Sequence, residues 1–121
     1  MIAVGSGTEF IATIREAPRA LVFISVPWSM PERLSRQTFE LAIAQLKTDL
    51  IYRSVAGFRL EVDEDAAAQQ WLASLGLQDW AINGAGGLLW VAAGKVVNQV
   101  SSAHSAGVAK IVAQTRALWP E

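Results

Sequence analysis

The chain has 121 residues, of which 52% are apolar, and its ten basic and eleven acidic side chains give a formal net charge of −1. This length and composition predict one folded domain spanning residues 1–121 and exclude a disordered chain. The balanced charge indicates no nucleic-acid partner and no anionic membrane partner. The chain contains no cysteine, which excludes disulfides, thiolate metal sites and thiol chemistry. No other motif indicates a metal or a cofactor.

The first residues lack the charged start and the long apolar run of a signal peptide. No apolar run in the sequence reaches the ~20 residues that a membrane-spanning helix needs. We therefore expect a soluble, cytoplasmic protein.

The first half of the chain predicts three strands separated by two helices. The run Ala20–Val26 is almost entirely apolar, which is typical of a strand buried on both faces. In the second helix, the apolar residues expected on one buried face are Leu34, Phe39, Ala42, Ile43 and Leu46. The predicted elements are a short strand at Ile2–Val4, a helix ending near Ala17, the strand Ala20–Val26, a helix at Pro31–Lys47 and a strand at Gly57–Val62.

Two serine–glutamate pairs have the spacing of a capping box, Ser6 with Glu9 and Ser29 with Glu32. In this motif the serine oxygen accepts a hydrogen bond from the backbone three residues later, and the glutamate reaches back to the cap. We therefore expect both serines to cap helices. On this interpretation Ser29→Ala lowers stability by roughly 0.5–2 kcal/mol.

The second half of the chain predicts a helix, a loop, a hairpin and a last helix. The acids Asp63–Asp65 suit the positive end of the helix that follows them. The element order β-α-β-α-β-α-β-β-α predicts an α/β fold whose central mixed sheet has helices on both faces. The predicted elements are a helix at Ala66–Leu75, a loop at Leu77–Gly87, strands at Leu88–Val91 and Lys95–Val100, and a helix capped by Ser101, Ser102 or Ser105.

The segment from Val26 to Glu32 resembles the active-site loop of thioredoxins, a tryptophan followed by a Cys-x-Pro-Cys turn. Trp28 and Pro31 match the motif, while Ser29 and Glu32 stand where the two cysteines would be. Further landmarks of the family are found in the same order at Phe10, Asp63, Gly94 and Lys95. The resemblance covers nearly the whole chain and implies a redox-inactive, thioredoxin-like protein. It also places Phe23 where the family has a buried acid, and Gly86 where it has a cis-proline.

The resemblance further implies a shallow groove for an extended peptide. The groove would be formed by Trp28, Ser29, Met30 and Pro31, by Ala85 and Gly86, and by Ser101 and Ser102. Trp28 falls in a predicted loop, where a large aromatic residue often marks a contact surface. The function expected first is therefore a non-catalytic binding or chaperone-like module that uses this groove for a peptide or protein partner.

Two alternatives remain open from the sequence. One is an enzyme in which His104 serves as the base for a Ser29 nucleophile, since His104 is the only histidine of the chain. The other is a structural subunit that forms a homodimer through an apolar patch including Trp80 or Trp119.

Overall fold

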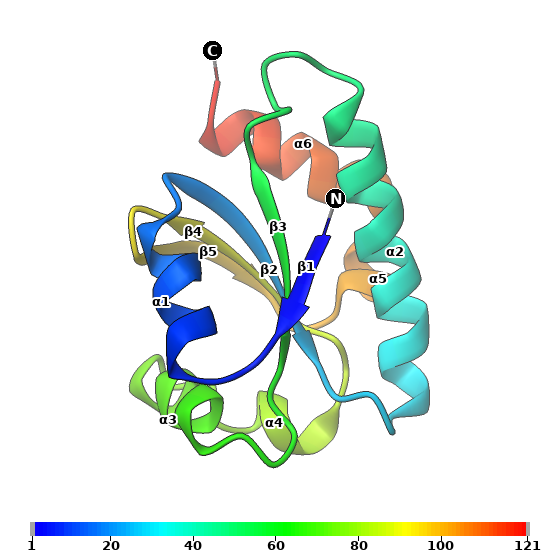
Figure 1. The fold of residues 1–121 in the computed structure, drawn as a ribbon. Coiled ribbons are helices and arrows are strands. Elements are labelled where there is room, and N and C mark those ends of the chain that lie inside the picture. The colour runs from blue at the N-terminus through cyan, green and yellow to red at the C-terminus, as the bar shows by residue number, and fades with distance from the viewer. Residues whose placement is uncertain (1, 121) are drawn as a thin grey trace.

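A mixed five-stranded sheet forms the centre of the protein in the computed structural model, which describes residues 2–120 (Figure 1). The strand order is β1-β3-β2-β4-β5, with β3 parallel to both β1 and β2, while β4 runs antiparallel to its neighbours β2 and β5. The predicted mixed α/β sheet is therefore confirmed. The strands are β1 (Ile2–Gly5), β2 (Arg19–Ser25), β3 (Ala56–Glu61), β4 (Leu88–Ala92) and β5 (Lys95–Val100).

Helices cover both faces of the sheet. Helices α1 and α3 lie on one face, and α2, α5 and α6 lie on the other (Figure 1). No helix within residues 2–120 combines the length and the apolar character needed to cross a membrane. The helices are α1 (Thr8–Glu16), α2 (Met30–Lys47), α3 (Ala66–Ser74), α4 (Trp80–Asn83), α5 (Ala103–Ala106) and α6 (Val108–Leu118).

Two local differences from the expected elements occur in the second half. The loop expected at Leu77–Gly87 contains the one-turn helix α4. The last helix is divided at Gly107, whose φ of +85° a right-handed helix does not accommodate, into α5 and α6. Ser102 is the N-cap of α5, where its hydroxyl oxygen accepts a hydrogen bond from the Ser105 amide at 3.2 Å.

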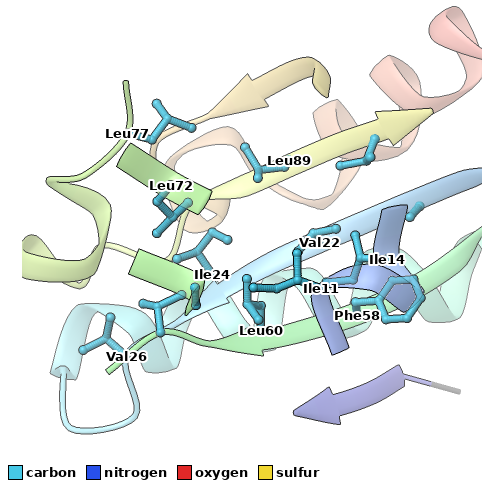
Figure 2. Close-up of a cluster of buried hydrophobic side chains, with 14 residues drawn as sticks. Ile11, Ile14, Val22, Ile24, Val26, Phe58, Leu60, Leu72, Leu77 and Leu89 are labelled. Carbon is cyan, nitrogen blue, oxygen red and sulfur yellow. The ribbon is translucent and has the colours of Figure 1, made fainter. Parts of the chain in front are cut away.

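Alternate residues of β2 fill two separate cores. Ala20, Val22 and Ile24 belong to the core beneath α1 and α3, where Figure 2 shows Val22 and Ile24 among side chains from both helices. Leu21 and Phe23 belong to the opposite core, beneath α2 and α6. This two-sided burial explains why the strand is a continuous apolar run rather than an alternating one.

The core beneath α2 orients that helix. Phe39 stacks on Phe23 with 5.3 Å between ring centroids, and Ala42, Ile43 and Leu46 are buried, as expected. The prediction for Leu34 is wrong, because half of its surface is exposed. Leu34 lies on the solvent side of α2, and Ser35 takes the inward position beside it.

The start of α1 does not form the expected capping box. Gly7, not Ser6, is the N-cap, and no side chain caps the helix. The Gly7 amide instead donates a 2.7 Å hydrogen bond to the carboxylate of Asp65, the residue that precedes α3. The first turn of α1 is thus joined to the start of α3 across 58 residues of sequence.

Candidate binding surface at the Trp28 loop

Three loops meet at the end of the sheet where β2 and β5 finish and β4 begins. They are the loop from Val26 to Ser29 before α2, residues 84–87 before β4, and residues 101–102 before α5. The antiparallel pairing of β4 with β2 and β5 brings these loops to one edge. The expected groove residues come from these three loops and from Met30 and Pro31, the first two residues of α2.

Ser35 of α2 joins the other two loops. Its hydroxyl donates to the carbonyl of Ala85 at 2.7 Å, accepts from the backbone amide of His104 at 3.1 Å, and lies 3.3 Å from the hydroxyl of Ser102. The Ala103 amide also donates to the carbonyl of Gly86 at 2.9 Å. Sequence reasoning missed Ser35, although its spacing of four and seven residues from Phe39 and Ala42 places it on the inner side of the helix.

Ser29 stands at the N-cap position of α2 but does not act as a capping side chain. Its hydroxyl is almost fully buried and donates a 2.7 Å hydrogen bond to the carbonyl of Gly84. No side chain caps α2. The predicted capping box is therefore wrong, because the serine hydroxyl fixes the Trp28 loop to the loop before β4 rather than to its own helix.

Glu32, expected to reach back to Ser29, instead points into the protein. Its side chain is fully buried, and one carboxylate oxygen accepts a 2.7 Å hydrogen bond from the hydroxyl of Ser25. The other oxygen lies 3.4 Å from Nε of Arg36 and has no hydrogen-bond partner among the described residues. A buried carboxylate thus occupies the position of the second cysteine in the resemblance. Ser25, the only polar residue in its apolar run, was the signal for this contact.

Large apolar side chains on both sides of Ser29 are exposed. Trp28 is 61% exposed and Met30 is 68% exposed. Leu34 lies one helical turn after Met30, so that these two side chains are neighbours on the surface of α2. We name Trp28, Met30 and Leu34 the Trp28 surface.

Gly86 has a conformation that proline does not adopt. Its φ is +78°, whereas proline is fixed near −65°, and the peptide bonds of the described residues are all trans. A Cβ atom at Gly86 would collide with the side chain of Ser35. This loop is therefore shaped by a left-handed glycine packed on α2.

The structure does not bring Ser29 and His104 together as a catalytic pair. The Ser29 proton is directed at the Gly84 carbonyl, and His104 has an exposed side chain at α5. No hydrogen bond within residues 2–120 joins the two side chains. No group of three or more metal-ligating side chains in the described part of the chain could hold a metal ion.

The tryptophans considered for a dimer patch pack onto the cores. Trp80 is the first residue of α4, not a loop residue, and it packs against the core beneath α1 and α3. Its ring lies so close to Gly87 that a Cβ atom there would collide with it. Trp119 is half-buried against the opposite core. Among the described residues, Trp28 is therefore the only tryptophan with an exposed side chain.

No protein-family model matches this chain, and no curated protein matches its sequence. Solved structures do match it. Thioredoxin f2 from Chlamydomonas reinhardtii aligns with a TM-score of 0.70 at 13% identity, covering 100% of this chain and 99% of that one. Oxidized thioredoxin O2 from Arabidopsis thaliana aligns with a TM-score of 0.69 at 15% identity, covering 98% and 94%. A mutant thioredoxin from Halobacterium salinarum aligns with a TM-score of 0.66 at 17% identity, covering 96% and 88%.

These alignments extend over nearly all of each chain and concern the fold alone. The chain contains no cysteine. Ser29 and Glu32 occupy the two cysteine positions of the Cys-x-Pro-Cys turn. The chain therefore has a thioredoxin-like fold, and as a cysteine-free member of this fold it has no thiol with which to carry out thiol–disulfide exchange.

Proposed function

We propose that this protein is a non-catalytic binding or chaperone-like module that holds an extended segment of a peptide or protein partner at the Trp28 surface. The single observation that carries the proposal is the exposure of Trp28 and Met30 on both sides of the buried, hydrogen-bonded Ser29. Exposed apolar side chains are costly to solvate, and a pair of them where a loop meets a helix is typical of a contact site.

The loop that carries Trp28 and leads into Met30 is held in place before any partner arrives. Ser29 is bonded to Gly84, and the neighbouring loop is bonded to Ser35 through Ala85. A preorganised surface loses little conformational entropy on binding, so that more of the contact energy appears as affinity. Met30 adds a flexible apolar side chain that adapts to different partner residues.

The adjoining loops complete the proposed groove. Ala85 and Gly86 lie against α2, and Ser102 is within 3.3 Å of Ser35. Trp28, Met30 and Pro31 would contact apolar partner side chains, while Ser101 and Ser102 would form the polar border on the other side. Binding would be non-covalent throughout, since the chain offers no sulfur nucleophile.

The test is a selection followed by a comparison of variants. Random dodecapeptides displayed on phage are selected on the immobilised protein, and the enriched peptides are synthesised with a fluorophore for anisotropy titrations. We expect Trp28→Ala to weaken binding by about 10-fold or more, as loss of an aromatic hot spot does. Leu50→Ala is the matched control, because Leu50 is an apolar residue that is 75% exposed at a turn beyond the other end of α2.

The proposal is contradicted if no peptide is enriched over an unrelated immobilised protein. It is also contradicted if Trp28→Ala and Leu50→Ala bind the selected peptides as tightly as the unaltered protein does.

A further inference from the structure

A cleft between α1 and α3 lies on the sheet face opposite α2. Figure 1 shows the two helices as neighbours on this face. The cleft has a volume of about 350 Å³, within the range of roughly 300–1,000 Å³ that ligand pockets span. Its lining residues are Thr8, Ile11, Ala12 and Arg15 from α1 and Ala67, Gln70 and Trp71 from α3.

The cleft arises from short side chains where two helices face each other. Thr8, Ala12 and Arg15 are spaced by four and three residues, so they share one face of α1. On α3, Ala67 and Trp71 are four residues apart and share the facing side. Alanines at the middle of both faces leave the space open, and the buried Ile11 forms its floor.

The walls combine an aromatic side chain with a single charge. Trp71 is half-buried, so that part of its indole is available to an adjacent flat group. Arg15 is the only charged residue of the lining, and it forms no ion pair with the other described residues. The cleft is therefore positively charged on one side and apolar on the other.

A second cleft of about 320 Å³ adjoins the first, because Ala12 and Arg15 line both. It is completed by Glu16 and by the β4–β5 turn at Ala93 and Gly94. Glu16 borders only this second cleft. An anion beside Trp71 would thus meet the guanidinium of Arg15 with no carboxylate in the lining.

We propose that the cleft between α1 and α3 binds a small aromatic carboxylate. Its ring stacks against Trp71 between Ala12 and Ala67, and its carboxylate pairs with Arg15. A guanidinium presents two parallel N–H donors that match the two oxygens of a carboxylate, which makes arginine the best side chain for this recognition. Thr8 and Gln70 supply hydrogen-bonding groups at the border of the same site.

The site is independent of the Trp28 surface. Its residues belong to α1 and α3, whereas Trp28, Met30 and Leu34 belong to α2 and the loop before it. A ligand in the cleft would therefore leave the proposed partner surface free.

The experiment is a titration of the ¹⁵N-labelled protein followed by NMR. The probes are benzoate, 3-phenylpropionate and indole-3-propionate, with 3-phenylpropionamide as the uncharged counterpart. We expect saturable shifts of the Ala12 and Ala67 amides and of the Trp71 indole N–H with at least one acid. We expect 3-phenylpropionamide to bind at least about 10-fold more weakly than 3-phenylpropionate, since it lacks the charge that Arg15 recognises.

Two variants with a matched control locate the site. Arg15→Gln should weaken binding of the acids about 10-fold or more, while Arg53→Gln, at an exposed arginine of the turns between α2 and β3, should not. Ala67→Leu should block the cleft, and the dispersion of its NMR spectrum reports directly whether this variant is folded.

The proposal is overturned if none of the three acids shifts the Ala12, Ala67 or Trp71 signals up to about 10 mM. It is also overturned if acid and amide bind equally, or if Arg15→Gln binds the acids as the unaltered protein does.

Discussion

The hydroxyl of Ser25, at the end of β2, donates a 2.7 Å hydrogen bond to the fully buried carboxylate of Glu32 in the first turn of α2. A carboxylate removed from water needs donors or a positive charge to compensate for its lost hydration. Ser25 supplies one donor, and Arg36 lies 3.4 Å away with 27% of its side chain exposed. Where a redox motif would have a cysteine, this chain thus has a buried polar contact between sheet and helix.

Removal of the Ser25 hydroxyl should therefore destabilise the fold. Ser25→Ala leaves a buried carboxylate oxygen without its donor, and we expect a loss of about 1–3 kcal/mol in the free energy of unfolding. The measurement is chemical denaturation at neutral pH. Ser101→Ala, at an exposed serine, is the control and should change stability by less than about 0.5 kcal/mol. Equal stability of the two variants would show that Ser25 does not support Glu32.

Variants of Ser29 distinguish two roles for its hydroxyl, as a helix cap and as a donor to the Gly84 carbonyl. Ser29→Ala should cost about 0.5–1.5 kcal/mol, because a buried hydrogen bond to Gly84 is lost. Aspartate is as good a helix cap as serine, since capping needs only an acceptor. The Gly84 carbonyl needs a donor, which an ionised aspartate lacks. We therefore expect Ser29→Asp to be less stable than Ser29→Ala in urea denaturation. If Ser29→Asp were as stable as the unaltered protein, Ser29 would act as a helix cap and not as a donor to Gly84.

Gly86 and Gly76 have nearly the same φ angle but different surroundings. Their φ angles are +78° and +75°, so alanine meets backbone strain, of about 1–2 kcal/mol in the left-handed region, at either position. At Gly76 a Cβ atom would find open space, whereas at Gly86 it would collide with Ser35. Thermal or chemical denaturation should show Gly86→Ala to be less stable than Gly76→Ala by about a further 1–3 kcal/mol. Similar losses at both sites would mean that Gly86 is not packed on α2.

Trp28 should matter for binding and not for folding. Its side chain is 61% exposed, and Trp28→Ala should change the free energy of unfolding by less than about 0.5 kcal/mol. Trp90→Ala provides the contrast, because Trp90 is fully buried and donates a 2.9 Å hydrogen bond to Thr115, so we expect a loss of about 3–5 kcal/mol. A large loss of stability in Trp28→Ala would assign Trp28 to the core instead of to a surface.

Much of the fold could be predicted because its strongest signals are local. The apolar run of β2, the amphipathic α2 and the turn at Gly94 each have a pattern that needs no distant partner. The two failed capping boxes depend on contacts between distant parts of the chain. The Gly7 amide is bonded to Asp65, and Ser29 is bonded to Gly84 across 55 residues, so neither predicted capping box forms.

The sequence predicts which loops come together, but not the side-chain contacts that hold them. The motif positions and the element order placed the Trp28 loop, Ala85, Gly86 and Ser102 at one edge of the sheet. Ser35 was not identified, because its spacing from Phe39 and Ala42 indicates the inner side of α2 but not the partners of its hydroxyl. Glu32 was expected to reach back to Ser29, because its actual partner Ser25 lies in another element and charged residues are rarely buried unless they are paired.

The most direct test of the account locates a bound peptide on the protein. A peptide obtained by the selection described above is given a nitroxide spin label at one end and added to the ¹⁵N-labelled protein. We predict that the label broadens the Trp28 indole signal and the amides of Met30 and Ala85, and that it leaves the amides of α1 and α3 unchanged. Broadening that is confined to α1 and α3, or to the β5 edge, with Trp28 unaffected, would contradict the assignment of the Trp28 surface as the binding site.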